Sequence, residues 1–557
     1  MFIAPTTVIG ATASDDLLPT RIRAQNWRSA EIGIPDRDLT DTALTDLAEA
    51  AASLDDTAFG RRVDAVLSSR RGRMPVIPDI ASAAEIFRQF LSSARIDGWL
   101  YVREPDGFLH PYLVTGIEME HGDKTRGPRI KVTLDADNPT VKRPSRAPRI
   151  LCFEDTEIVG KTAEEALTSA GAFRESAALK ADYADRRARF QEIIETGFGA
   201  QFVFTGRAIR TDDHRAANRR TARRVVDDVA PGEVAALRGV AASVLFDEGD
   251  YGEVPVVTAV RVFDLAAQDF LDVNTGDLTA YAYDPSLQDK LVLPAEQREL
   301  LTILTSDITV FTGDIIDGKA AGNVILAKGR PGVGKTLTAE VYAEAIGRPL
   351  YSIHSGSLGT TPEAVRKNLE TIFDRAKRWD AVLLLDEADV FVLERGLDLI
   401  QNAIVAEFLR TLEYFDGLLF LTTNRSDGVD EAILARCAAV IDYEAPTPAD
   451  ARRIWEIMAE GNDVVLEPAL LDRLVADFPG ITARDIKMVL RLALRISAHR
   501  GGPLAFADFA HAARFRGIEA TPRAGVADAI GEPNEEPVAT THGGRAAADA
   551  PAAAEVA

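Results

Sequence analysis

A glycine-rich turn between an apolar strand and a helix constrains this chain more than any other feature. A strand is predicted over residues 323–327, and it leads into Gly329-Arg330-Pro331-Gly332-Val333-Gly334-Lys335-Thr336. Glycines let backbone N–H groups turn inward around an anion, and the helix beginning at Lys335 points its positive end at the same place. The segment matches G-x-x-x-x-G-K-[ST] in full, which predicts a phosphate-binding loop in an α/β fold.

Two further apolar runs end in polar side chains. Residues 381–385 are all apolar, as in a buried parallel strand, and they run into Asp386 and Glu387. Ligands of such sheets lie at the carboxyl ends of the strands, so we expect these acids beside the phosphates. The run at residues 418–423 ends at Asn424. An amide there can hydrogen-bond a γ-phosphate and a water, although Asn is also a common cap or turn residue.

These side chains have distinct expected roles toward ATP and Mg²⁺, the predicted cofactors. Lys335 would meet the β- and γ-phosphates, while Thr336 and Asp386 would hold the metal. Glu387 would be the base that polarises the attacking water, assisted by Asn424. The predicted nucleotide contacts are Gly329, Arg330, Pro331, Gly332, Val333, Gly334, Lys335, Thr336, Leu337 and Asp386.

The order of these motifs resembles the AAA+ superfamily, and its AAA branch in particular, over about residues 291–516. Residues 421–424 match the sensor 1 element, and residues 480–487 look like the sensor 2 element of a helical lid. Four short segments resemble more closely a poorly characterised AAA group common in filamentous fungi. These segments are residues 334–340, 384–391, 408–414 and 421–425.

The resemblance implies an architecture and two arginine roles. It implies a P-loop parallel-sheet core with a C-terminal helical lid, plus an α+β region before it. Arg436 matches the arginine finger, which reaches the γ-phosphate bound by a neighbouring subunit, so the active form would be a ring, by resemblance a hexamer. Arg484 matches sensor 2, which contacts phosphate within its own subunit. The alternative for each is a surface arginine in a salt bridge.

The sequence also departs from the family. Many AAA proteins carry a second arginine shortly after the finger, whereas Cys437 follows here. Members that thread polypeptides place an aromatic residue and a glycine in the loop after the second strand. The corresponding loop, residues 355–361, has no aromatic residue, and Leu358-Gly359 is a weak substitute. The missing aromatic residue counts against processive polypeptide threading and leaves open whether the protein threads polypeptide.

Length and composition set the expected domain organisation. The 557 residues suggest roughly three or four domains. We expect an α+β substrate or adaptor region at 1–285, with a split near 75–80, then the nucleotide-binding domain at 286–446. A helical lid at 447–518 and a disordered tail at 519–557 would follow, because the tail is rich in Ala, Pro, Gly and acids. The first part, to about residue 73, reads as helical, with one helical pattern over residues 40–67.

The charge and the cysteine content indicate which partners and which cellular compartment to expect. The formal net charge of −23 opposes unaided binding to nucleic acid or to an anionic membrane. No run of about 18 apolar residues predicts a membrane span, and the first 15 residues do not read as a signal peptide. The two cysteines lie far apart, which favours a reducing, cytoplasmic location.

Two readings of the function remain open. The first is a ring-forming ATPase that remodels a macromolecule, with protein a better candidate than nucleic acid. The second is a nucleic-acid-associated ATPase, a loader or a defence sensor. Its support is one basic cluster: Arg207, Arg210, Arg215, Arg219, Arg220, Arg223 and Arg224. Phosphate contacts need such charge, although a solvated loop or helix face has the same composition, and Phe202 and Phe204 nearby fit a strand core.

Overall fold

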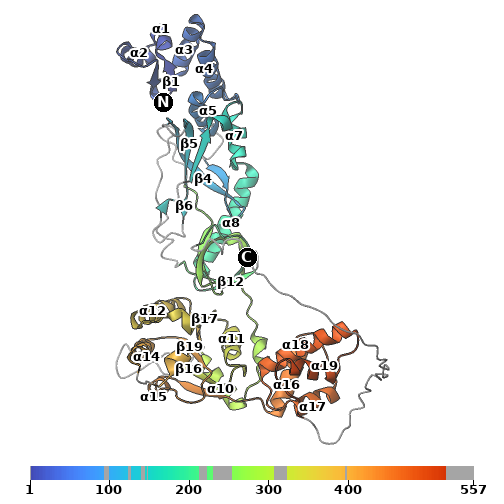
Figure 1. The fold of residues 1–557 in the computed structure, drawn as a ribbon. Coiled ribbons are helices and arrows are strands. Elements are labelled where there is room, and N and C mark those ends of the chain that lie inside the picture. The colour runs from blue at the N-terminus through green and yellow to red at the C-terminus, as the bar shows by residue number, and fades with distance from the viewer. Residues whose placement is uncertain are drawn as a thin grey trace, which may run out of the picture. The chain divides into compact units, whose positions relative to one another are not determined.

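The structure is a computed structural model of the chain (Figure 1). It describes residues 2–92, 99–122, 127–138, 145–146, 149–211, 222–229, 254–306, 323–394 and 398–521. The chain forms two compact units, and the boundary between them falls between Ala445 and Pro446. The predicted tail from residue 522 onward lies outside the described residues.

The first part of the chain combines helices with an antiparallel sheet. Its helices are α1 (Thr6–Ala11), α2 (Leu18–Gln25), α3 (Asp41–Ser53), α4 (Thr57–Arg70), α5 (Ile80–Ser92), α6 (Asp155–Ile158), α7 (Ala163–Ser169) and α8 (Ala177–Thr196). A five-stranded sheet has the order β8-β5-β4-β3-β9, made of Arg149–Glu154, Arg129–Asp135, Leu109–Glu120, Trp99–Arg103 and Ala172–Arg174. Two short pairs accompany it, β1–β2 (Phe2–Pro5, Glu31–Ile34) and β6–β7 (Asp137–Asn138, Ser145–Arg146). One apolar core runs from Phe2 to Ala172, which joins the helices before residue 75 to this sheet.

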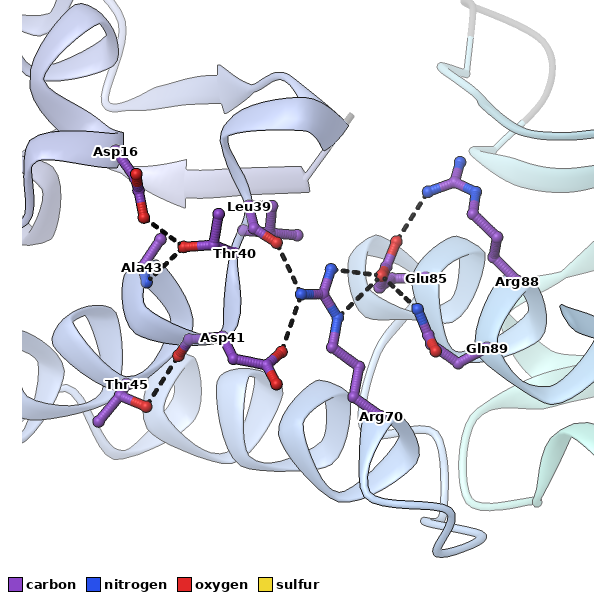
Figure 2. Close-up of polar contacts among 10 residues, drawn as sticks. All are labelled: Asp16, Leu39, Thr40, Asp41, Ala43, Thr45, Arg70, Glu85, Arg88 and Gln89. Atoms are coloured by element: carbon purple, nitrogen blue, oxygen red, sulfur yellow. Dashed lines mark hydrogen bonds and ion pairs between the residues drawn. The ribbon is translucent and has the colours of Figure 1, made fainter. Parts of the chain in front are cut away.

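A buried carboxylate ties three of these helices together (Figure 2). Glu85 of α5 accepts hydrogen bonds from Arg70 of α4 at 2.8 Å and from Arg88 at 2.7 Å. Arg70 also donates to Asp41, in the first turn of α3, at 3.1 Å. Burial alone would lower the pKa of the Arg70 guanidinium, but Glu85 and Asp41 outweigh burial and raise it. The network thus fixes the ends of α3, α4 and α5 against one another.

A six-stranded sheet follows in the same compact unit. Its order is β11-β14-β13-β12-β10-β15, made of Arg210–Thr211, Asp269–Asn274, Ala259–Asp264, Arg223–Asp227, Gln201–Phe204 and Leu278–Ala280. All of its pairings are antiparallel. Phe202 and Phe204 are buried in its core, which confirms that these two rings are core residues.

The phosphate-loop region is a parallel sheet with helices on both faces. The strand order is β17-β18-β19-β16-β20, made of Leu350–His354, Val382–Asp386, Leu418–Thr423, Asn323–Gly329 and Ala439–Tyr443. Successive strand residues alternate between two cores. Leu383 and Leu385 pack toward α12 (Pro362–Arg378) and α14 (Leu399–Leu412), while Val382 and Leu384 pack toward α11 (Lys335–Ile346) and α10 (Ala295–Thr305). Two shorter helices are α13 (Asp389–Val392) and α15 (Glu431–Leu434). The expected α/β P-loop core is confirmed.

The second compact unit is helical. It contains α16 (Pro448–Glu460), α17 (Pro468–Asp477), α18 (Ala483–Arg500) and α19 (Phe506–Arg514). Trp455 and Phe509 meet edge to face in its core, with ring centroids 5.6 Å apart. These four helices are the helical segment expected after the parallel sheet. The domain limits proposed from the sequence otherwise stay predictions.

The sequence pattern was wrong about the first part of the chain in two respects. The single helical pattern over residues 40–67 is two helices, because Asp55 has a left-handed φ of 57° and Asp56 caps α4. Leu54, which fits the helical spacing, is 48% exposed. Strands β1 and β2 also interrupt the stretch that reads as helical, and they pair with each other over only four residues each.

Candidate functional site

The glycine-rich turn joins β16 to α11 and adopts backbone angles that favour glycine. Gly329, Gly332 and Gly334 have φ values of 146°, 86° and 111°. A Cβ on Gly329 would lie 2.3 Å from the carbonyl oxygen of Tyr443 on the neighbouring strand β20. Gly329 is therefore required for two reasons: its φ favours glycine, and β20 approaches too closely for a side chain. The turn leads directly into α11, whose first residue is Lys335.

The Lys335 side chain contacts both the loop and the end of a second strand. It is 7% exposed, and its Nζ donates to the carbonyl oxygens of Gly329 at 2.7 Å and Arg330 at 2.8 Å. The same Nζ lies 3.0 Å from Oδ1 of Asn424, the residue that follows β19. β16 and β19 are parallel neighbours in the sheet, so their carboxyl ends lie at one edge. The structure thus brings together the predicted Lys335 and Asn424.

A second set of contacts joins the helix start to the acidic strand end. The Thr336 hydroxyl donates to Oδ1 of Asp386 at 3.0 Å, and the Thr422 hydroxyl donates to the same oxygen at 2.5 Å. Glu387 is exposed and has a left-handed φ of 54°, while its backbone N–H donates to the Thr422 hydroxyl at 3.0 Å. A non-glycine residue in this region stores strain, which structures tolerate mainly where a side chain must be aimed.

Two side chains of this site did not follow from the motifs. Thr422 bonds both Asp386 and the backbone of Glu387. Asp389 accepts from the Thr423 hydroxyl at 2.5 Å and from the backbone N–H of Asn424 at 2.9 Å. Both therefore fix the strand ends that carry the predicted site. Their signal in the sequence is weak: a Thr pair before Asn424 and a second acid three residues after Asp386.

The two predicted arginines take part in none of the contacts described above. Arg436 donates to the carbonyl oxygen of Ala432 at 3.0 Å and lies 3.4 Å from a Glu413 carboxylate oxygen. Its Nε is buried without a partner among the described residues. Arg484 belongs to the second compact unit, where it is exposed in the first turn of α18. Cys437, next to Arg436, is a thiol whose pKa burial raises to about 12.

The loop after β17 gives Leu358 a structural position. Leu358 is fully buried in the core below α12, and its carbonyl oxygen accepts from Asn368 at 3.1 Å. The substitute for a pore aromatic is thus a core residue. His354, at the end of β17, is exposed, which agrees with its interpretation as a strand-end residue.

The basic cluster is only partly described. Arg215, Arg219 and Arg220 lie outside the described residues. Arg223 is buried 3.6 Å from the Asp264 carboxylate, and Arg224 lies 3.2 Å from Glu344. Both side chains pair with an acid of the chain, although Arg224 itself is exposed.

Two other kinds of site are absent from the described part of the chain. None of its helices is both long and apolar enough to cross a membrane. Nor do its His, Cys, Asp and Glu side chains gather in groups of three or more that could hold a metal ion.

One segment of the chain matches a known protein family. Residues 325–445 match the family described as "ATPase family associated with various cellular activities (AAA)". An uncharacterized AAA family ATPase of Sinorhizobium fredii is 26% identical over 222 residues, which are 36% of this chain and 65% of the relative. The ATP-dependent zinc metalloprotease FtsH 3 of Synechocystis is 28% identical over 194 residues, 32% of this chain and 30% of the relative.

A solved structure, the FIGL-1 AAA domain in complex with ADP, aligns with 42% of this chain and 85% of its own length. Its identity is 22% and its TM-score 0.34. The chain spans less than two thirds of both relatives named above. The matched segment contains the strand order, the phosphate loop and the acidic strand end described here. Residues 325–445 of this chain thus match the ATPase domain of the AAA family.

Proposed function

We propose that the protein is an ATP-hydrolysing AAA+ machine that assembles into a ring, a hexamer, and remodels a macromolecular substrate. The observation that carries the proposal is the gathering of Lys335, Thr336, Asp386 and Asn424 at one edge of the sheet. An ammonium, a hydroxyl, a carboxylate and an amide in contact are the groups that ATP hydrolysis requires.

The side chains divide the chemistry among them. Lys335 and the backbone from Gly329 to Leu337 bind the phosphates. Thr336 and Asp386 suit Mg²⁺, because they present hard oxygen atoms that already lie 3.0 Å apart. Mg²⁺, when bound, neutralises charge on the phosphate oxygens. Glu387 takes a proton from water as the water oxygen bonds to the γ-phosphorus and ADP leaves, and Asn424 orients that water.

The two arginines complete the proposal across the assembly. Arg436 reaches the γ-phosphate bound by a neighbouring subunit, where a planar cation neutralises charge on the transferred phosphoryl group. Arg484 contacts the phosphates of its own subunit from the helical unit. Each would exchange its present surroundings, Glu413 in the case of Arg436, for phosphate oxygens.

Protein is the proposed substrate class. One relative is named a metalloprotease, and the net charge of −23 opposes long-range attraction of nucleic acid. The nucleic-acid alternative gains nothing from Arg223 and Arg224, which pair with Asp264 and Glu344. We place the protein in the cytoplasm, away from membranes. Its membership of the fungal AAA group stays a prediction.

Glu387→Gln tests the chemistry directly. The amide keeps the size of the side chain but cannot accept the proton, so the variant should bind ATP and hydrolyse it at least about 100-fold more slowly than the wild type. Steady-state phosphate release and titration with a fluorescent ATP analogue measure the two properties. Size-exclusion chromatography with light scattering would show whether the ATP-loaded variant accumulates as a ring.

The matched control is Glu370→Gln, which removes the same charge from an exposed position on α12 that pairs only with Arg366 at 2.9 Å. This control should hydrolyse ATP at the wild-type rate. Hydrolysis by Glu387→Gln within twofold of the wild type would remove Glu387 from the role of base. A wild-type protein that neither binds nor hydrolyses ATP would overturn the proposed function.

A further inference from the structure

The phosphate-loop helix is attached to the six-stranded sheet through a buried acid. Glu344 lies on α11, nine residues after Lys335, and is 9% exposed. Its carboxylate accepts from the Tyr281 hydroxyl at 2.6 Å, from Arg224 Nη1 at 3.2 Å and from the backbone N–H of Asp284 at 3.2 Å. All three donors precede the AAA segment in sequence. We call these four residues the Glu344 cluster.

The cluster is built to keep its geometry. The Arg224 guanidinium lies 4.7 Å from the centroid of the Tyr281 ring, so the cation contacts both the ring and the acid. Burial and the bond to Glu344 raise the pKa of Tyr281 to about 12, so its hydroxyl stays protonated and keeps donating at neutral pH. A buried carboxylate that lost these donors would be left unpaired, which is strongly unfavourable.

A second attachment lies at the other end of the same joint. Phe263 of β13 packs on Trp379 and Tyr351, with centroids 4.9 Å and 5.6 Å away, and all three rings are buried in one core with the parallel sheet. The Trp379 indole N–H donates to Asp228 at 2.8 Å. Gly199, with a φ of 76°, lets the backbone approach Trp379 so closely that an added Cβ would lie 3.2 Å from its Cα.

Between the two attachments the joint is open. A groove of about 830 Å³ is lined by Tyr281 and Tyr283 on the sheet side and by Arg348, Arg378 and Trp379 on the ATPase side. The aromatic attachment fixes the sheet to the ATPase core, whereas the Glu344 cluster bonds to the helix that carries the phosphate loop. A straight α-helix transmits displacement along its axis, and from Lys335 to Glu344 this axis is about 13 Å long.

We propose that Glu344 is a positioning residue for ATP turnover, through which the six-stranded sheet fixes α11 and responds to nucleotide at the phosphate loop. The inference rests on the proposed ATPase function and extends it: the described residues 201–211, 222–229 and 254–284 belong to the ATPase unit and are not a freely tethered recognition module. Coupling of this kind is reciprocal, so loss of the cluster must weaken nucleotide binding as well as the response of the sheet.

The test uses full-length variants and two measurements on each. Tyr281→Phe removes one donor, and Glu344→Leu removes the acid at similar volume. Glu344→Gln keeps one acceptor oxygen, which can serve Tyr281 and Arg224, because these two donate to one carboxylate oxygen and Asp284 donates to the other. We measure the Kd for a fluorescent ATP analogue, and hydrogen exchange of residues 278–284 with and without a slowly hydrolysed ATP analogue. In the wild type, the analogue should slow exchange there by about fivefold or more.

The variants should differ in how much of this response they keep. Tyr281→Phe and Glu344→Leu should bind the analogue about fivefold or more weakly, with exchange at residues 278–284 insensitive to nucleotide. Glu344→Gln should restore part of both properties, which a merely structural role would not produce. Tyr283→Phe is the matched control, because that hydroxyl has only a 3.5 Å contact with Gln201, and it should behave as the wild type.

The outcomes separate this inference from the proposed function. A wild type that binds nucleotide but shows no change at residues 278–284 would overturn the inference and leave the ATPase assignment standing. Equal losses in Tyr281→Phe and Tyr283→Phe would also overturn it. If Glu344→Leu does not fold, the comparison of the two tyrosine variants still decides. A wild type without nucleotide binding would overturn both.

Discussion

Lys335 is the buried cation of the candidate site, and its ammonium donates to the Gly329 and Arg330 carbonyl oxygens and to Asn424. In Lys335→Ala the loop loses both the charge that meets phosphate and the contacts that hold its own carbonyls. We expect ATP affinity to fall by at least about tenfold, since hydrogen bonds to charged groups contribute about 1.5–3 kcal/mol. Titration with a fluorescent ATP analogue measures the change.

Lys328 provides the comparison for that experiment. It lies on β16 directly before the loop and pairs with Asp442 at 3.0 Å. Lys328→Ala should keep the wild-type affinity, because its ammonium is directed to β20. Unchanged affinity in Lys335→Ala, with an intact melting curve, would contradict the phosphate-loop assignment.

The buried Asp227 leads to a separate prediction about how stability depends on pH. Burial raises its pKa to about 7, and the nearby Asp228 carboxylate also raises it, whereas the hydrogen bond from the Val229 backbone N–H at 3.0 Å lowers it. The other carboxylate oxygen of Asp227 is buried without a partner among the described residues. The folded state therefore holds a proton that the unfolded state has already released. Stability from this group is greatest at low pH and is lost as pH rises from about 4 to about 7. Asp227→Asn, which is neutral throughout, should lack this loss.

The measurement is the melting temperature of both proteins between pH 5 and pH 8. The difference in favour of Asp227→Asn should grow as pH rises through 7 and then become constant. Asp374→Asn, at an exposed position on α12, should follow the wild type at every pH. Parallel curves for Asp227→Asn and the wild type would show that Asp227 does not titrate in this range.

Among the helices and strands, the parallel sheet followed from the sequence and much of its surroundings did not. Apolar runs ending in Asp386 and Asn424 give strands whose ends must meet, because parallel neighbours share an edge. The pairing of Trp379 with Asp228 joins residues 151 positions apart, and no local pattern encodes it. The break at Asp55 depends on a single left-handed residue, which interrupts the helix although the helical periodicity continues through it.

The buried ionic network at the junction of α3, α4 and α5 can be tested by removing its central acid. In Glu85→Ala, Arg70 and Arg88 lose a carboxylate whose side chain is 6% exposed, so two guanidinium groups remain without it. Removing one partner of a buried pair costs about 3–5 kcal/mol. We expect the free energy of unfolding of the first part of the chain to fall by this amount, which calorimetry measures. Glu370→Ala, from an exposed pair, should cost less than about 1 kcal/mol. Equal losses in the two variants would contradict the network's role.

For the assembled protein, the proposal places Arg436 in the neighbour's site. Arg436→Ala should bind ATP normally but lose turnover, by about 10³-fold on the pattern of other arginine fingers. Mixing Arg436→Ala with Lys335→Ala subunits creates interfaces where both residues are intact. Phosphate release by the mixture should exceed the sum of the two variants alone.

Subunit exchange is the control for the mixing experiment. Cys152 is exposed, whereas the Cys437 thiol is half-buried and its pKa is about 12, so a maleimide dye should label Cys152 selectively. Energy transfer between two dyes then reports exchange. Wild-type turnover by Arg436→Ala protein shown to be monomeric would exclude the shared site.

The shared core of the six-stranded sheet and the parallel sheet has a consequence for inheritance. Val226 and Phe263 lie in one apolar cluster with Tyr351 and Trp379. A gene rearrangement that transferred only residues 286–446 to a new protein would leave Trp379 and Tyr351 uncovered and Glu344 without its donors. Successful recombination must instead move the segment from about residue 200 onward. Homologues that share this ATPase domain and these aromatic residues should therefore also share the sheet, whatever precedes it in their genes.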